Sequence, residues 1–282
     1  MSKNSKKVWF ITGASRGFGA LITAEALAAG DAVVATARDP AGVTARFGAH
    51  PNLLPVRLDV TREDQVQEAV KQAVKRFGRI DILLNNAGYG LLGAVEESSA
   101  VEVERLFATN VFGLLGVTRA VLPHMRQQRA GHVINISSIG GYSAYLGWGV
   151  YGATKFALEG ITEALAAELA PLGIHATVVE PGFFRTDFLD DQSLSKTVQR
   201  IGDYAETVGA MRDFAAGHNH AQPGDPAKLA KAMLQLGHAE QPPVRLPLGS
   251  DTVEAIERKN VTVAAELAQW RALALSTDYA AA

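Results

Sequence analysis

Short apolar runs rich in β-branched residues alternate with longer segments of helical periodicity along most of this 282-residue chain. The alternation starts near residue 8 and continues beyond residue 180. Nearly continuous apolar runs are typical of parallel strands that helices cover on both faces. The pattern therefore predicts an α/β fold with a doubly wound parallel sheet of about seven strands. The predicted strands are Val8–Thr12, Ala32–Thr36, Leu53–Leu58, Ile80–Asn85, His132–Ser137, His175–Glu180 and Val244–Leu248.

The segment between the third and fourth strands illustrates the intervening helices. Its apolar residues fall on one helical stripe, which suits a crossover helix between parallel strands. These residues are Val66, Ala69, Val70, Ala73, Val74 and Phe77. No Pro-, Gly- or Ser-rich linker divides the chain, so we expect residues 1–282 to form a single domain.

Residues 187–225 depart from the alternation. Their apolar residues recur at steps of three, four or seven, which predicts an amphipathic helix that leaves the sheet and covers the site as a lid. These residues are Leu194, Val198, Ile201, Val208, Met211 and Phe214. A polar loop follows, and Asp251 with Glu254 predicts a capping box that opens a C-terminal helix.

Composition excludes several classes of protein. The chain contains no cysteine, which rules out disulfides, thiolate metal sites and a cysteine nucleophile. Its net charge of −2 provides no field that would attract nucleic acid. The apolar run Val8–Ile11 is shorter than the core of a secretory signal, and no segment of about 20 apolar residues suggests a membrane span. We therefore expect a cytoplasmic protein.

Three glycines follow the first predicted strand directly and precede a helical pattern. Gly13, Gly17 and Gly19 would let the backbone turn sharply and approach a pyrophosphate at the helix N-terminus. The alternative is a tight turn without a ligand. At the end of the second strand no carboxylate occupies the position that would select NAD(H), Arg38 follows directly, and Arg16 supplies a second cation. Guanidinium–phosphate pairing favours NADP(H) over NAD(H), although Arg38 could simply be solvated.

Tyr151 and Lys155 are four residues apart in a helical pattern, so their side chains lie side by side. A phenol needs a lowered pKa to act as an acid–base catalyst, and a fixed ammonium beside it favours the anion. Ser137 and Ser138 end a predicted strand at the sheet edge where α/β folds bind ligands, and either hydroxyl could contact a substrate oxygen. No GxSxG elbow supports a serine nucleophile.

These motifs together resemble the short-chain dehydrogenase/reductase family, in its single-domain branch with a Rossmann-type fold. The matching residues cover about 7–190 and include the glycine loop, Asn85–Gly88, Asn110, Ser138, Tyr151, Lys155, Pro181 and Gly182. The Asn85–Gly90 motif and the Arg16/Arg38 pair are similar to those of 17β-hydroxysteroid and retinol dehydrogenases.

The resemblance assigns roles to individual residues. It implies that Tyr151 is the acid–base residue, that Lys155 lowers its pKa and binds the nicotinamide ribose, and that Ser138 rather than Ser137 binds substrate. Asn110 would hold a water in a proton relay. The implied cofactor contacts are Gly13, Ser15, Arg16, Gly17, Phe18, Gly19, Arg38, Asp59, Val60, Asn86, Ala87, Gly88, Tyr151, Lys155, Pro181, Gly182 and Thr186. The resemblance also implies a homodimer or homotetramer built on the helices of residues 99–128 and 150–170.

Aromatic residues near the catalytic segments favour an apolar ketone or alcohol as substrate, although aromatics at a sheet edge are often core residues. They are Tyr142, Tyr145, Trp148 and Phe183. His218 and His220 occupy a polar loop with no carboxylate pair nearby in sequence, so we expect them to be solvated and predict no metal. Two alternatives stay open at this point, namely a dehydratase or epimerase on the same scaffold and a non-catalytic NADP(H)-sensing regulator.

Overall fold

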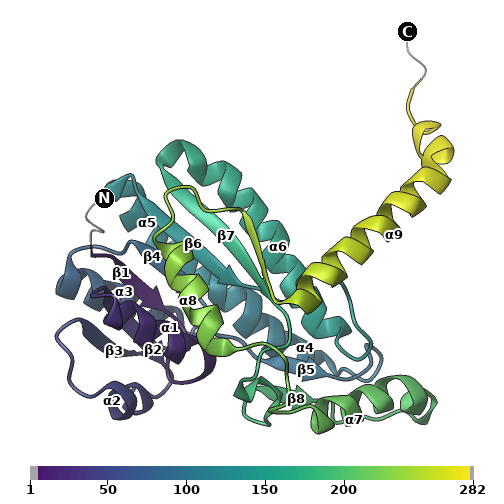
Figure 1. Ribbon diagram of the computed structural model, residues 1–282, viewed down its shortest axis with the longest axis horizontal. Coiled ribbons are helices and arrows are strands. Elements are labelled where there is room, and N and C mark those ends of the chain that lie inside the picture. Colours follow the sequence, from purple (N-terminus) through teal and green to yellow (C-terminus); the bar gives the residue numbers. More distant parts are fainter. Residues whose placement is uncertain (1–5, 280–282) are drawn as a thin grey trace.

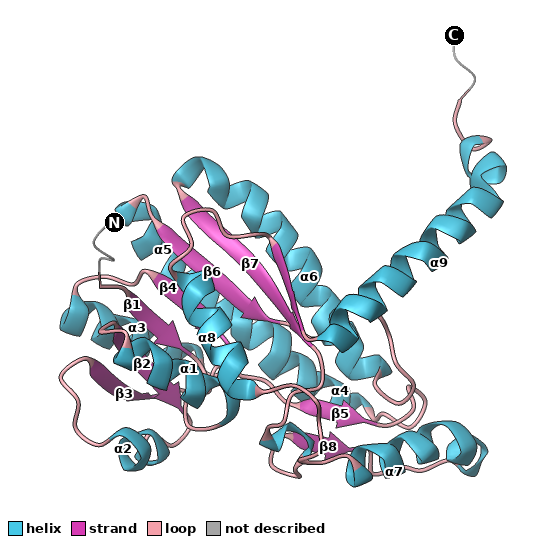
Figure 2. Cartoon of the chain, in the orientation of Figure 1, coloured by secondary structure: helices cyan, strands magenta, loops and turns pink. Residues whose placement is uncertain are grey.

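The computed structural model describes residues 6–279 and has a parallel seven-stranded sheet at its centre, in the order β3-β2-β1-β4-β6-β7-β9 (Figure 2). The expected α/β sheet is confirmed, and each predicted strand is present with ends shifted by at most two residues. The strands are β1 (Val8–Ile11), β2 (Ala32–Ala37), β3 (Leu53–Arg57), β4 (Ile82–Asn85), β6 (Gly131–Ile136), β7 (Ile174–Pro181) and β9 (Arg245–Leu248).

Helices cover both faces of this sheet, as the continuous apolar strands predicted (Figure 1). One face packs against α1 (Gly17–Ala28), α2 (Ala41–Phe47) and α8 (Pro226–Gly237). The other packs against α3 (Glu63–Phe77), α5 (Leu114–Gln128) and α6 (Gly149–Leu169). The helical stripe predicted between the third and fourth strands is therefore the buried side of α3.

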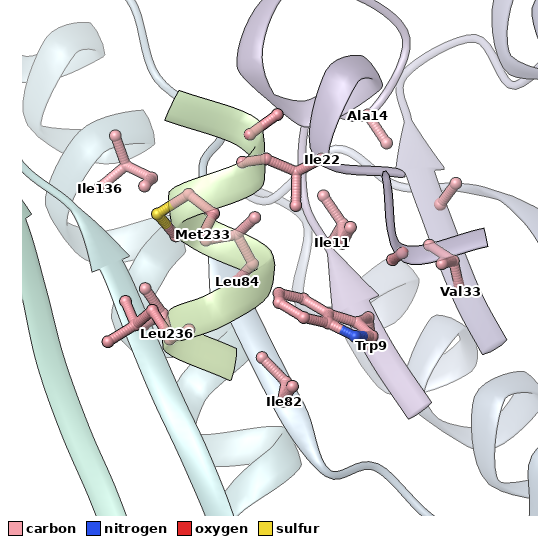
Figure 3. Packing of buried hydrophobic residues seen from close by; sticks show 14 of the residues in the cluster. Trp9, Ile11, Ala14, Ile22, Val33, Ile82, Leu84, Ile136, Met233 and Leu236 are labelled. Carbon is pink, nitrogen blue, oxygen red and sulfur yellow. The ribbon is translucent and has the colours of Figure 1, made fainter. Parts of the chain in front are cut away.

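Trp9 fills the space between β1 and α8 (Figure 3). Its indole is fully buried, and the indole nitrogen donates to Asp31 Oδ2 at 2.8 Å. A Cβ atom placed on Gly237 of α8 would lie 2.4 Å from the ring, so only glycine allows this approach. The contact between Gly237 and the Trp9 ring therefore fixes the distance between α8 and β1.

The stretch Ala100–Gln128 is long and apolar enough to cross a bilayer by composition, contrary to the expectation that no segment would be. It comprises α4 (Ala100–Phe107), a π-helical turn (Ala108–Gly113) and α5. More than half of its apolar part is buried inside the fold, where α5 packs against α3 and β4. The buried part of its apolar residues therefore contributes to the core of this domain.

The segment 187–225 differs from the single amphipathic helix predicted for it. Leu194 lies in a short strand, β8 (Leu194–Lys196), which pairs with β5 (Gly90–Leu92), and Val198 is 91% exposed. Apart from short 3₁₀ turns, helical structure starts with a π-helical turn at Ala205–Gly209 and continues as α7 (Ala210–Gly217). Backbone pairing with β5 holds Leu194–Lys196 extended, whatever the spacing of the apolar residues in this segment.

A buried carboxylate holds this segment to the rest of the domain. Glu97 accepts hydrogen bonds from the backbone nitrogens of Ala94 at 2.8 Å and Ile201 at 2.9 Å, and it pairs with Arg212 of α7. Burial raises the pKa of Glu97, but these hydrogen bonds and the Arg212 charge outweigh it and lower the pKa to about 2. Glu97 is therefore charged at neutral pH and joins two distant segments.

The predicted capping box at the start of the last helix is wrong. Helix α9 (Ser250–Leu275) has Gly249 at its N-cap, and no side chain caps it. Asp251 Oδ2 instead accepts a hydrogen bond from the backbone nitrogen of Phe183 at 2.7 Å. The carboxylate therefore accepts a hydrogen bond from the backbone of the loop that follows β7, and sequence spacing does not reveal this contact. Short 3₁₀ turns complete the fold at Ile139–Gly141, Ala170–Leu172, Asp187–Leu189 and Gly202–Tyr204.

Candidate active site

A cavity of about 810 Å³ opens at the carboxyl ends of the central strands. The strand order reverses between β1 and β4, which is where ligands bind in doubly wound sheets. The predicted site residues line this cavity, except for Gly19 and Asn110. The lining residues are Gly13, Ser15, Arg16, Gly17, Phe18, Arg38, Asp59, Val60, Asn86, Ala87, Gly88, Ser138, Tyr145, Trp148, Tyr151, Lys155, Pro181, Gly182, Phe183 and Thr186.

The loop between β1 and α1 has the geometry of a pyrophosphate cradle. Gly13 and Gly17 have φ angles of +67° and +53°, a region that side chains disfavour. A Cβ on Gly19 would lie 2.3 Å from the Gly13 carbonyl oxygen. Gly19 therefore allows the start of α1 to pack closely against the loop, and it does not line the cavity. A Cβ on Gly17 would meet nothing within 4 Å, so the loop borders open space at the N-terminus of α1.

Hydrogen bonds from the end of β4 hold the glycine loop in place. Thr12 Oγ accepts from the backbone nitrogens of Asn86 and Ala87, both at 3.0 Å. The Asn86 side-chain amide donates to the carbonyl oxygens of Thr12 at 2.9 Å and Gly13 at 3.1 Å. The residues predicted to contact a dinucleotide therefore form one rigid wall, and the residues present fit such a group.

The two predicted phosphate-binding cations differ in their surroundings. Arg38 is exposed at the cavity and has no hydrogen-bond or ion-pair partner among residues 6–279. Arg16 instead donates to Gln192, both to its side chain and, at 2.6 Å, to its carbonyl oxygen. Gln192 belongs to the segment that leaves the sheet, so Arg16 bridges the two sides of the cavity. Of the two predicted phosphate-binding cations, only Arg38 has no side-chain partner among the described residues. Asp59 accepts from the Thr61 backbone nitrogen at 3.0 Å and hydroxyl at 2.7 Å.

Tyr151 and Lys155 lie one turn apart on α6 and both reach the cavity. Lys155 Nζ donates to the carbonyl oxygen of Ile136 at 2.8 Å and lies 5.7 Å from the centre of the Tyr151 ring. Trp148 and Phe188 pack against that ring with centroid distances of 5.6 Å and 5.8 Å. The phenol is therefore held by contacts on several sides.

Burial dominates the titration of this pair. It raises the pKa of Tyr151, and a hydrogen bond with Ser138 only partly opposes the rise. It also lowers the pKa of Lys155 to about 8, against the opposing charge of Glu159. Desolvation of the phenolate is the larger effect on Tyr151 in this structure, and the expectation that Lys155 lowers the pKa of Tyr151 stays a prediction.

The structure distinguishes the two adjacent serines. The Ser138 hydroxyl lies beside Tyr151 and accepts from the Gly140 backbone nitrogen at 3.1 Å. The Ser137 hydroxyl turns toward α6 and donates to the Lys155 carbonyl oxygen at 3.5 Å. Both serines follow β6 directly, and their hydroxyls point in different directions, so only Ser138 faces the phenol.

Asn110 lies in the π-helical turn behind the cavity and is buried. Its amide exchanges two hydrogen bonds with the backbone of Tyr89, at 3.0 Å and 3.1 Å, and donates to Thr154 Oγ at 3.2 Å. Asn110 thus ties the loop after β4 to the catalytic helix. A Cβ on Gly88 would lie 3.1 Å from Asn110 Oδ1 and 3.9 Å from Lys155 Nζ, so these groups share one corner.

Tyr145, Trp148 and Phe183 line the cavity as predicted, but Tyr142 does not. The Tyr142 hydroxyl donates to Asn260 Oδ1 of α9, away from the site. Sequence reasoning missed several lining residues, including Tyr89, Arg105, Phe188, Leu189, Gln192 and Gln222. Most come from the segment 187–225, where no motif marks them.

His220 does face carboxylates, which the sequence did not suggest. Its ring and the carboxylates of Asp187 and Asp190 lie within 4.8 Å of one another. His220 and Asp187 are exposed, and Asp190 also accepts a hydrogen bond from Asn219. The absence of a metal site stays a prediction, but its original reason, the lack of nearby carboxylates, is wrong.

The chain is similar to known proteins over most of its length. The family model described as short chain dehydrogenase matches residues 7–197. The oxidoreductase BOA17 of Botryotinia fuckeliana is 39% identical over 96% of this chain and 99% of its own length. The 3-ketodihydrosphingosine reductase of Bacteroides thetaiotaomicron is 39% identical over 86% of this chain and 88% of its own.

Solved structures agree with these relatives. A short-chain dehydrogenase from Streptomyces avermitilis superposes with a TM-score of 0.90 at 41% identity, over 98% of this chain and 100% of that one. ElxO with NADP bound has a TM-score of 0.73 at 29% identity, over 88% and 99% of the two chains. A 3-ketoacyl-(acyl-carrier-protein) reductase from Brucella melitensis complexed with NADH has a TM-score of 0.73 at 27% identity, over 87% and 98%. Structural neighbours therefore bind either nicotinamide cofactor.

Proposed function

The chain belongs to the short-chain dehydrogenase family of NAD(P)-dependent oxidoreductases, and from that premise we propose that it interconverts a ketone or aldehyde and an alcohol with NADP(H). One observation carries the proposal. The buried phenol of Tyr151, with Ser138 and Lys155 beside it, lines the same cavity as the glycine loop. A hydride donor and a proton donor can therefore act on one substrate.

NADP(H), when bound, supplies or accepts the hydride. Gly13, Ser15, Gly17 and Phe18 would hold its pyrophosphate over the N-terminus of α1, with Gly19 keeping the loop closely packed. We propose that Asp59 and Val60 contact the adenine, that Asn86, Ala87, Gly88, Pro181 and Gly182 line the cofactor, and that Thr186 binds its carboxamide. Lys155 would bind the nicotinamide ribose.

The chain's own residues move the proton. We propose that the Tyr151 hydroxyl gives its proton to the carbonyl oxygen during reduction and takes one from the alcohol during oxidation. The Ser138 hydroxyl, beside the phenol, donates a hydrogen bond to the same oxygen. The Lys155 ammonium stabilises the phenolate that reduction leaves, and Asn110 positions a water behind Lys155 for reprotonation.

An apolar substrate fits the far part of the cavity. Tyr145, Trp148, Phe183 and Phe188 form aromatic walls there, and the segment 187–225 supplies one side as a lid. The relative named as a 3-ketodihydrosphingosine reductase supports a ketone. The narrower resemblance to hydroxysteroid and retinol dehydrogenases stays a prediction.

The test of the catalytic proposal is Tyr151→Phe, with Tyr142→Phe as the matched control. Loss of the phenolic hydroxyl should abolish turnover of a ketone panel while leaving NADPH affinity intact, because the ring and its packing remain. Tyr142 lies outside the cavity, so its variant should turn over normally. Unchanged turnover in Tyr151→Phe would contradict the proposal and favour the NADP(H)-sensing alternative.

The proposed preference for NADP(H) rests on Arg38, whose guanidinium is free to pair with the 2′-phosphate. Arg38→Asp should lower kcat/KM for NADPH relative to NADH by on the order of tenfold to a hundredfold, because a hydrogen bond to a charged group contributes about 1.5–3 kcal/mol. Arg46→Asp makes the same charge change on nearby α2, outside the cavity. Equal use of both cofactors by the parent protein would refute the preference.

A cytoplasmic location and a homodimer or homotetramer complete the proposal. The chain contains no cysteine, which is compatible with a reducing compartment. Phe112 and Phe156 are exposed on the helices expected to form the interface, and the Phe112 ring lies 6.4 Å from that of Phe107, which packs on an apolar cluster of Val111, Leu114 and Leu158.

A further inference from the structure

The last helix extends away from the body of the protein (Figure 1). The base of α9 packs against β9 and the turn at Ile139–Gly141, and the last side-chain hydrogen bond from α9 to the described body is that of Tyr142 with Asn260. Every residue from 260 to 279 is exposed. A helical segment without tertiary contacts is only marginally stable in water, since packing of an apolar face supplies most helix stability. We call residues 260–279 the arm. The arm therefore lacks a packed apolar contact that would stabilise its helix.

The arm carries a regular apolar stripe. Successive members are spaced by three, four, three, four, three and four residues, which is the heptad repeat of a coiled coil. They are Val253, Ile256, Asn260, Val263, Leu267, Trp270 and Ala274. Leu267 is 57% exposed and Trp270 59% exposed, and Ile256, at the base, connects the stripe to the body.

The charges beside the stripe favour a second copy of the same helix. Glu257 and Glu266 alternate with Lys259 and Arg271 in the flanking positions, so the flanks carry both signs. In a parallel pair, Glu266 of one helix occupies the flanking position that faces Arg271 of the other, twice by symmetry. Asn260 is the single polar member of the stripe, and its Oδ1 accepts from Tyr142 of the same chain, so the interface with a second helix starts beyond it, at Val263.

The opposite face argues against a bilayer as the partner. It carries Glu254, Arg258, Val261, Thr262, Ala265, Ala268, Gln269, Ala272 and Leu275, with Arg258 as the single cation among them, whereas membrane-surface helices are rich in Lys and Arg on the polar face. We propose that the stripe of α9 is a coiled-coil interface that joins the last helices of two copies of this chain. The proposal is independent of the catalytic one, because none of these residues lines the cavity.

Trp270 provides a direct readout. The chain has three tryptophans, and Trp9 and Trp148 are buried. Subtracting the emission of Trp270→Phe from that of the parent isolates Trp270, whose quenching by acrylamide reports its exposure. In the purified parent we expect quenching several-fold weaker than in Leu267→Glu, which places a charge in the stripe. Ala265→Glu adds the same charge to the opposite face and should behave like the parent.

Mass by light scattering tests the identity of the partner. Leu267→Glu should halve the mass of the assembly while Ala265→Glu leaves it unchanged, and both should keep their affinity for NADPH. Freely quenched Trp270 in the parent would overturn the proposal. Protected Trp270 with an unchanged mass in Leu267→Glu would also overturn it, since the stripe would then cover part of its own chain.

Discussion

Two carboxyl groups lie buried near Lys155, and neither of them lines the cavity. Glu159 follows Lys155 by one turn of α6, and Glu180 is on β7. Arg245 of β9 pairs with both, with Glu180 Oε1 at 3.1 Å. Burial, together with the charge of Glu180, raises the pKa of Glu159 to about 7. The three groups come from three elements and form a charged network behind the proposed catalytic pair.

This network should set the alkaline limit of activity. Burial lowers the pKa of Lys155 to about 8 while the charge of Glu159 raises it, so Lys155 loses its proton as the pH rises through that value. Glu159→Gln removes the negative charge and should shift the alkaline limb of the pH–kcat profile to lower pH, by up to about one unit. Glu163→Gln, an exposed partner of the same arginine, is the control. If the alkaline limbs of the Glu159→Gln and Glu163→Gln profiles coincide, the proposed effect of Glu159 on the pKa of Lys155 is contradicted.

At the scale of elements, the contact between α8 and β1 leaves no room for an added methyl group. Gly237→Ala would force a methyl group to within 2.4 Å of the Trp9 ring, which Asp31 holds in place. We expect a loss of about 1–3 kcal/mol in the free energy of unfolding, the usual cost of overpacking.

Urea denaturation would measure this loss, with Gly160→Ala as the matched control. A Cβ on Gly160 of α6 meets nothing within 4 Å, so alanine there should stabilise the helix by roughly 0.5–1 kcal/mol. Equal effects of the two substitutions would show that helix propensity, and not contact with Trp9, decides the outcome.

At the scale of the whole molecule, the exposed apolar face on α5 and α6 should decide assembly, together with the arm of α9. Phe112 is 62% exposed in the π-helical turn that leads into α5. Phe112→Asp should halve the mass measured by light scattering, because it places a charge in a desolvated contact. Val198→Asp changes a residue that is still more exposed but lies on the segment 187–225, and the assembly should tolerate it. An unchanged mass in Phe112→Asp would exclude this face as an interface.

The sequence by itself determined the succession of strands and helices along the chain, the glycine loop and the pairing of Tyr151 with Lys155. Each of these is local: apolar periodicity reports which face an element buries, and residues four apart on a helix are neighbours in any fold. The position of the cavity followed as well, because the carboxyl ends of parallel strands share one edge of the sheet.

Tertiary structure alone decided the rest. β8 forms by backbone pairing with β5, which leaves no trace in side-chain spacing, and Asp251 serves the loop after β7 when its spacing predicted a helix cap. Gln192 reaches Arg16 across 176 positions of sequence. Such contacts depend on how elements are placed relative to one another, and that placement results from packing of the whole chain, which no local pattern encodes.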